Sequence, residues 1–391
     1  MRSRTRVVGL ALGFALALGA AYELWLPAQV DWEPARLGEL AAERAEGLVL
    51  QDRSGGDLWA SRGFALYRSR SGERFERVTT IWPRLGPAWA GFSRTFRDTF
   101  RYQELVEAMV LDERTLLAFA GGDAYRVNLA SGDTERVHRL RYFGPGRGRG
   151  LMPHGLTRDA SGTIYYGEYP SGTPAAGETV RIWRSRDDGR SWETAHEFAA
   201  GAVRHVHAVQ WDAIGNALWV ATGDKNAECR IGYSRDEGET FTWIGEGSQT
   251  FRAVSLLFTP MAVSWGMDSP AVPTHLVRWQ RATGRLDVSP QLLPSPAYYA
   301  TPLGGERGLI TLAEREAALW LVQGGALREL ARWAVEPSAS FPHPSVRLLR
   351  GANALDASGP VIANPLRTIS EPAAIYRLDR AELDPSELGS H

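Results

Sequence analysis

The chain has 391 residues, which allows either two average domains or one large all-β domain. The net charge is −1 with both signs interspersed, so nothing in the charge pattern favours nucleic acid or an anionic surface as a partner. A single cysteine, Cys229, excludes an internal disulfide bond, and 41 glycines with 22 prolines are typical of many short strands joined by turns.

The first thirty residues have the composition of a targeting segment. Three arginines within the first six residues precede an apolar stretch over 7–26, close to the roughly 20 residues that span a bilayer. The basic flank predicts that the N-terminus stays inside. We therefore expect residues 1–30 to form a membrane-spanning signal anchor of a single-pass protein with an extracytoplasmic domain. The alternative is a signal peptide cleaved near Gly19 and Ala21, which would give a secreted or periplasmic protein.

The rest of the chain alternates short apolar runs with turn residues, the pattern of propeller blades or sandwich strands. Two stretches differ. The sequence PARLGELAAERAE over 34–46 predicts a short helix within a linker over 31–46, and Tyr102–Met109 is a second helical candidate. We expect one β-propeller domain over 47–380, followed by a disordered tail over 381–391.

A short repeat recurs along the chain. Residues 184–192 read RSRDDGRSW and residues 233–241 read YSRDEGETF; both fit S-x-D-x-G-x-[ST]-[WF], the Asp box, and a weaker copy occupies 67–75. The pattern predicts a tight hairpin in which the aspartate binds turn amides, the glycine takes a positive φ and the aromatic ring packs between sheets. We assign these residues to the scaffold: Asp187, Gly189, Trp192, Asp236, Gly238 and Phe241.

With these hairpins as markers, each repeat divides into four strands. Seven such units are predicted between residues 47 and 378, with six as the alternative because Trp82–Arg101 shows no clear strands. The last unit lacks a fourth strand, so we expect an N-terminal strand to complete it and close the ring, which removes exposed sheet edges. A two-sheet sandwich is less favoured because the unit length repeats.

In a propeller, the start of the first strand and the end of the second strand of each blade lie on one face. Three consecutive units place titratable groups at these two positions, and such groups near a channel are costly unless paired, hydrated or functional. We therefore expect a site at the channel mouth. The candidate catalytic residues are His154, Glu168, His205, His207, Asp224 and Asp268, and the candidate substrate-binding residues are Tyr169, Gln249, Arg252, Tyr298 and Tyr299.

His205 and His207 are two residues apart on one strand, so both side chains face the same way and suit a divalent metal ion or acid–base chemistry. The candidate metal ligands are His154, His205, His207 and Gln249. Every candidate also has a structural alternative, because strand histidines often bond within the core and acidic residues beside glycines often cap turns. The basic tract GPGRGRG over 144–150 is interpreted as a rim that attracts an anionic substrate, since no strand–loop–helix context supports a phosphate loop.

Residues 151–269 resemble the sialidase-like, Asp-box (BNR) propeller superfamily, and look similar to its bacterial glycosyl-hydrolase-like members. The series that carries the resemblance is His154-Gly155, Gly167-Glu168-Tyr169, His205-Val206-His207, Thr222-Gly223-Asp224, Gly247-Ser248-Gln249 and Asp268-Ser269-Pro270. The resemblance implies a propeller fold and contact with glycans. Sialidase activity is not implied, because the chain has no F/Y-R-I-P motif.

A looser similarity links the chain to propeller polysaccharide lyases, which act on uronates with His and Tyr at the channel mouth, some with a metal held by His and Gln. The expected function is that of an extracytoplasmic carbohydrate-active propeller that cleaves a polysaccharide or oligosaccharide, as a glycoside hydrolase or a uronate lyase. The alternative is a non-catalytic propeller of the cell envelope that binds glycan or acts as a scaffold.

Overall fold

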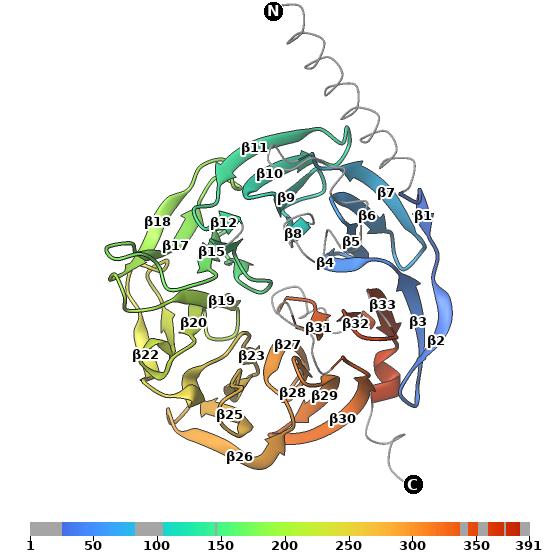
Figure 1. The fold of residues 1–391 in the computed structure, drawn as a ribbon. Coiled ribbons are helices and arrows are strands. Elements are labelled where there is room, and N and C mark those ends of the chain that lie inside the picture. The colour runs from blue at the N-terminus through green and yellow to red at the C-terminus, as the bar shows by residue number, and fades with distance from the viewer. Residues whose placement is uncertain are drawn as a thin grey trace, which may run out of the picture.

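The computed structural model describes residues 26–82, 105–144, 147–336, 343–350, 359–370 and 373–383. In this part of the chain, seven antiparallel sheets of four or five strands are arranged around a common axis (Figure 1). The predicted all-β propeller is confirmed, and the described residues form seven blades rather than six.

The blades follow one another along the chain. Blade 1 contains β4 (Val49–Ser54), β5 (Asp57–Arg62), β6 (Ala65–Ser69) and β7 (Phe75–Thr80), with β1 (Gln29–Val30) at its outer edge. Blade 2 contains β8 (Leu105–Val110), β9 (Thr115–Ala120), β10 (Asp123–Asn128) and β11 (Thr134–Arg139). Blade 3 contains β14 (Leu156–Arg158), β15 (Ile164–Gly167), β17 (Val180–Ser185) and β18 (Glu193–Phe198). Blade 4 contains β19 (His205–Asp212), β20 (Ala217–Gly223), β21 (Arg230–Ser234) and β22 (Thr242–Glu246).

Blade 5 contains β23 (Leu257–Phe258), β24 (Ala262–Gly266), β25 (Thr274–Gln280) and β26 (Leu286–Leu293). Blade 6 contains β27 (Ala297–Gly304), β28 (Arg307–Leu312), β29 (Ala317–Gln323) and β30 (Ala326–Trp333). A small additional sheet contains β12 (Phe143–Gly144), β13 (Gly148–Gly150) and β16 (Tyr169–Pro170). Three single-turn 3-10 helices are described: η2 (Asn226–Glu228), η3 (Gln249–Phe251) and η5 (Arg380–Leu383). The expectation of a disordered tail over 381–391 is corrected for its described residues 381–383, which lie in η5, where Leu383 is buried.

Blade 7 joins the two ends of the chain. Its inner strands β31 (Ser345–Leu348), β32 (Val361–Leu366) and β33 (Ala374–Leu378) are completed by β3 (Leu40–Glu46) and β2 (Glu33–Leu37). Strand β3 pairs antiparallel with β33, with Glu43 opposite Arg377. The prediction that an N-terminal strand closes the ring is therefore confirmed.

The expected linker helix over 34–46 is wrong, because β2 and β3 form a hairpin there that turns at Gly38 with φ 61°. Ala, Leu, Glu and Arg are good helix formers, but hydrogen bonds to the free edge of β33 outweigh this weak local preference. Likewise, the helical candidate over 102–109 is corrected: its described part lies in strand β8.

The Asp-box hairpins have the predicted geometry. Asp187 Oδ1 accepts hydrogen bonds from the Ser191 backbone N–H and the Ser185 hydroxyl, both at 2.8 Å, and Gly189 has φ 81°. The Trp192 ring contacts Phe119 of blade 2 with ring centroids 6.2 Å apart. This Asp box therefore stabilises its own turn through hydrogen bonds and also packs against blade 2 through its tryptophan.

A buried ion network joins three blades near the axis. Glu107 on β8 is fully buried and pairs with Arg347 on β31 at 2.6 Å and with Arg350 just beyond that strand. Arg350 also lies 3.1 Å from Asp52 on β4. Two guanidinium groups thus neutralise two carboxylates and link blades 7, 1 and 2.

The predicted N-terminal anchor over 1–30 falls largely on residues 1–25, which lie outside the described residues. Among the residues that the structure does describe, none belongs to a helix that is long and apolar enough to cross a bilayer. The expected single-pass membrane localisation is accordingly corrected, because no helix among the described residues could span a bilayer.

Candidate functional site

A cavity of about 210 Å³ lies on the face where the first strands begin and the second strands end. It brings together seven of the predicted residues: Tyr169, His205, His207, Asp224, Arg252, Asp268 and Tyr298. These residues come from the small additional sheet and from blades 4 to 6, so the face predicted from strand order is the one on which they meet.

The two histidines are held by strand β19 and by backbone carbonyl groups. A β-bulge at His207 shifts the pairing of β19 with β20, and such bulges re-aim side chains. His205 Nδ1 lies 2.9 Å from the Pro170 carbonyl oxygen, and His207 Nδ1 lies 3.2 Å from that of Ala253. Since a carbonyl only accepts, both Nδ1 atoms carry the proton. The two Nε2 atoms then face each other at 2.9 Å.

A glycine makes this approach possible. A side chain at Gly223 would place its Cβ 2.8 Å from His207 Cε1. Glycine at the end of β20 therefore lets the imidazole pack against the backbone, immediately before Asp224.

Asp224 is the centre of the cluster. Its Oδ1 lies 3.3 Å from both Nε2 atoms and 3.0 Å from Arg252 Nη2, and its Oδ2 accepts from Arg204 at 2.7 Å. Two arginine side chains, Arg204 and Arg252, lie within hydrogen-bond distance of this carboxylate and favour its charged form. Asp224 is therefore a fixed anion.

Asp268 has a different environment. It is 3% exposed, and its Oδ2 accepts from Arg252 Nε at 3.1 Å. Its Oδ1 is buried and has no hydrogen-bond partner among the described residues. Burial raises the pKa of Asp268 to about 7, against the opposing effect of Arg252. This carboxyl can thus exchange a proton near neutral pH.

Two tyrosines complete the wall of the cavity. Tyr169 stacks on His205 with ring centroids 4.0 Å apart and an interplanar angle of 14°. Tyr298 donates its hydroxyl proton to Glu314 Oε1 at 3.2 Å. Burial raises the pKa of both phenols, so both remain protonated at neutral pH.

Four predicted residues do not line this cavity. Gln249 is adjacent, but its amide donates to the Asp224 carbonyl at 2.9 Å rather than pointing at the histidines. Glu168 faces the small sheet and blade 3, where it accepts from Trp183 Nε1 at 2.9 Å and from Arg141. Tyr299 is buried, with its ring 4.8 Å from that of His154.

His154 is also absent from the cluster. Its Nδ1 lies 3.1 Å from Ser255 Oγ and its Nε2 lies 3.0 Å from the Leu348 carbonyl oxygen, so both nitrogens are used within the scaffold. Its φ of 65° turns the side chain away from the direction expected for an extended strand. The structure therefore separates His154 from His205 and His207.

Because His154 is buried and neutral, acid should weaken the fold through it. Burial lowers the pKa of His154 to about 3, whereas an unfolded histidine titrates near 6.5. Between these values the unfolded chain binds the additional proton, so the free energy of unfolding falls as the pH falls, by about 1.4 kcal/mol per pH unit. We expect urea unfolding between pH 6.5 and 5 to include this contribution, and His154→Asn, a residue type that tolerates positive φ, to show a slope smaller by that amount. An equal pH dependence of the free energy of unfolding in the two proteins would contradict this prediction.

The cavity also contains residues that the sequence analysis did not select. Those with charged or titratable side chains are Arg149, Arg204, Glu314 and His343. Arg149 belongs to the basic tract over 144–150 that was expected at the rim, and Arg204 directly precedes His205. Glu314 follows the second strand of blade 6 and His343 precedes the first strand of blade 7, so the rule that selected the others would have found both.

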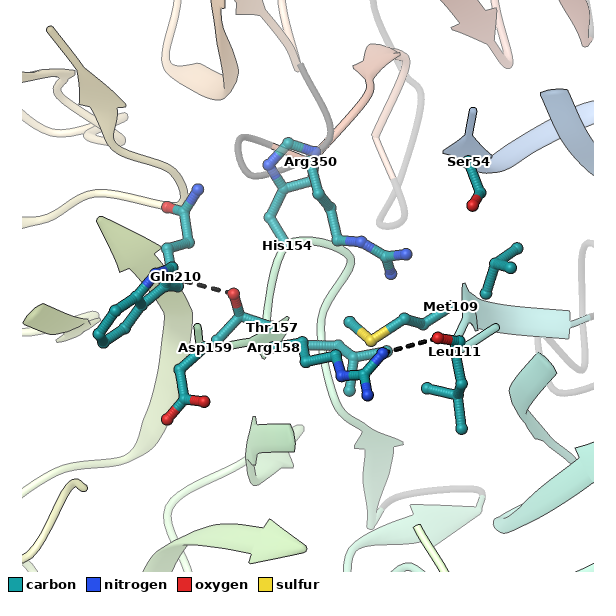
Figure 2. A pocket seen from close by; sticks show the side chains of 12 residues that line it. Ser54, Met109, Leu111, His154, Thr157, Arg158, Asp159, Gln210 and Arg350 are labelled. Carbon is teal, nitrogen blue, oxygen red and sulfur yellow. Dashed lines mark hydrogen bonds between the residues drawn. The ribbon is translucent and has the colours of Figure 1, made fainter. Parts of the chain in front are cut away.

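A second cavity, of about 320 Å³, lies among the far ends of the inner strands of blades 1 to 4 (Figure 2). His154 and Arg350 line it together with Arg158, Thr157 and Gln210. Arg158 donates to the Leu111 carbonyl at 2.7 Å, and Thr157 Oγ1 accepts from the Trp211 amide at 3.0 Å (Figure 2). These two side chains thus connect neighbouring blades of the propeller.

Comparisons with known proteins define the fold class. No family model matches the sequence, and no curated protein matches it. An oligogalacturonate lyase from Vibrio parahaemolyticus is similar with a TM-score of 0.55, at 10% identity over 90% of this chain and 96% of that one. A GH74 xyloglucanase from Xanthomonas campestris has a TM-score of 0.51, at 17% identity over 87% and 52%. An ancestral GH74 enzyme has a TM-score of 0.52, at 11% identity over 86% and 45%.

At these identities, the similarity establishes a shared fold. The chain is a β-propeller of the kind that carbohydrate-active enzymes also use. The sialidase-like superfamily that the sequence resembles is not shown by these comparisons.

Proposed function

We propose that the chain is a carbohydrate-active enzyme that cleaves an acidic polysaccharide or oligosaccharide at the channel mouth, by elimination. The observation that carries this proposal is a single cavity lined by three arginine side chains and by a buried carboxylate, Asp268, that has one oxygen without a hydrogen-bond partner among the described residues. These are the two kinds of group that elimination from a uronate requires.

The arginines supply recognition of a carboxylate. Arg149, Arg204 and Arg252 line the cavity, and a guanidinium group binds a carboxylate through two parallel hydrogen bonds. Arg204 Nε is buried and has no hydrogen-bond partner among the described residues, so it retains a donor for a ligand. The oligogalacturonate lyase with a similar fold has an acidic sugar in its name, which supports the same substrate class here.

Asp268 is the group that we assign to proton removal. Its free Oδ1 would take the proton on the sugar carbon next to the carboxylate, and an arginine would stabilise the negative charge that develops on that carboxylate. The electron pair then forms a carbon–carbon double bond as the bond to the glycosidic oxygen breaks. The leaving oxygen takes up a proton, so the products are an unsaturated uronate and a free sugar hydroxyl.

Hydrolysis is a second candidate, supported by three carboxylates in the cavity. Asp224, Asp268 and Glu314 line it, and a glycoside hydrolase uses two carboxylates flanking the bond. The GH74 enzymes of similar fold favour this reading. Against it, Asp224 is committed to four cationic or imidazole partners, which leaves Glu314 as the partner of Asp268.

The experiment is to incubate the purified chain with a set of acidic glycans, such as polygalacturonate, alginate and glucuronans, and with neutral glycans such as xyloglucan. We expect an ultraviolet-absorbing unsaturated product from at least one acidic glycan. New reducing ends without that absorbance would replace elimination by hydrolysis. Tight binding of glycans without any cleavage would identify a non-catalytic binding propeller.

A further inference from the structure

The cluster of His205, His207 and Asp224 has an arrangement that the proposed reaction does not explain. Both Nδ1 atoms donate to backbone carbonyl groups, so each neutral imidazole presents an unprotonated Nε2 to the same point. The third atom at this point is Asp224 Oδ1, another acceptor; Arg252 Nη2 approaches this oxygen at 3.0 Å but does not serve the two nitrogens. Three lone pairs that converge in a buried place repel one another unless a cation lies between them.

We infer that His205 Nε2, His207 Nε2 and Asp224 Oδ1 bind one divalent transition-metal ion. A proton on one imidazole would join only one pair of these acceptors, whereas a metal ion binds all three. The inference concerns the chain's own ligand atoms and does not depend on which glycan is cleaved.

The separations of the three atoms fit a coordination sphere. They are 2.9 Å between the two nitrogens and 3.3 Å from each nitrogen to the oxygen. Ligands about 2.1 Å from a metal ion are about 3.0 Å apart at adjacent octahedral corners and about 3.4 Å apart in a tetrahedron. The three atoms therefore form one face of such a polyhedron with little movement.

The surroundings of the ligands match those of built metal sites. Metal-binding histidines usually donate their other N–H to a carbonyl or carboxylate, as both do here, and this fixes the orientation of the ring. Arg204 holds Asp224 Oδ2, which keeps Oδ1 aimed at the histidines. Because β19 and β20 are paired strands, the ligands are placed before any ion binds.

The donor set also indicates the kind of ion. Two imidazole nitrogens and one carboxylate suit zinc, manganese or iron(II), whereas calcium and magnesium prefer oxygen ligands alone. The three ligand residues all line the cavity of about 210 Å³. This leaves coordination positions open to a substrate, as in catalytic rather than structural sites.

Metal content tests the inference without any assay of activity. The full-length chain, purified without a histidine tag and without chelators, is expected to contain about one transition-metal ion per molecule, or to bind one added Zn²⁺ or Mn²⁺. The H205A/H207A double variant and Asp224→Asn are expected to bind these ions at least 100-fold more weakly. His275→Ala is the matched control, because His275 bonds to the Ser289 carbonyl of the neighbouring strand and does not line the cavity. It should bind normally.

A measurement on the unaltered chain covers the case in which a variant fails to fold. Addition of Zn²⁺ should shift the imidazole Nε2 resonances of two of the eight histidines. Absence of binding by the unaltered chain, unchanged binding by the double variant, or shifts at other histidines would overturn the inference. None of these outcomes affects the glycan assay, so failure of the metal site and failure of the proposed reaction remain distinguishable.

Discussion

Asp268→Asn is expected to reduce kcat on an acidic glycan by about 10²- to 10⁴-fold while leaving KM nearly unchanged. The asparagine keeps the shape of the side chain and an oxygen that accepts from Arg252, but it cannot take up a proton. Because the lost group acts on the reacting proton rather than on substrate binding, the effect should appear in kcat. Steady-state kinetics with thermal unfolding of both proteins provide the measurement.

The comparison needs a control aspartate of the same blade that lies outside the cavity. Asp287→Asn on β26 serves, because among the described residues the hydrogen bonds of Asp287 go to its own blade, such as that from Gln280 at 2.9 Å, so the change should not alter kcat. A variant at position 268 that keeps more than a tenth of the original kcat would remove Asp268 from the reaction. It would leave the residue as a structural partner of Arg252.

Glu107→Ala is expected to destabilise the fold by about 3–5 kcal/mol, the largest stability change that we predict. The change removes the carboxylate that Arg347 and Arg350 share and leaves only Asp52 to neutralise two guanidinium groups that are buried, at 4% and 7% exposure. A buried charge that has lost its partner destabilises the fold by more than the intact ion pair stabilises it. Urea unfolding followed by tryptophan fluorescence measures the difference.

Two further variants make the result specific. Glu107→Gln keeps the volume and should be destabilising by less, because the amide oxygen still accepts from one arginine. Glu135→Ala removes an exposed glutamate from the outer strand of the same blade and should change stability by less than about 0.5 kcal/mol. If Glu107→Ala were as mild as Glu135→Ala, the network would not hold the three blades together.

Much of the candidate site could be predicted from strand order alone. The start of a first strand and the end of a second strand meet on one face, and the register of His205 opposite Gly223 places Asp224 beside the histidines. The same rule, applied to blades 6 and 7, selects Glu314 and His343. Strand order does not predict the direction of a side chain. Glu168, for example, accepts a hydrogen bond from Trp183 and lies away from the cavity.

Local backbone conformation limits the prediction in a similar way. His154 precedes β14 rather than lying within it, and its positive φ directs the ring to Ser255 and Leu348. These partners are distant in sequence, so no local pattern encodes the contact. The fold prediction failed at β3 for the same reason, since its pairing partner β33 comes from the other end of the chain.

That pairing has a consequence for how the protein acquires its structure. During synthesis, β3 emerges from the ribosome among the first residues of the propeller, but its partner β33 is made more than three hundred residues later, as the Glu43–Arg377 contact shows. Contacts so distant in sequence form slowly, and an unpaired strand edge is open to association with other chains in the meantime. We therefore expect refolding in which blades 2 to 6 gain structure first and blade 7 closes last, with aggregation greatest before that final step.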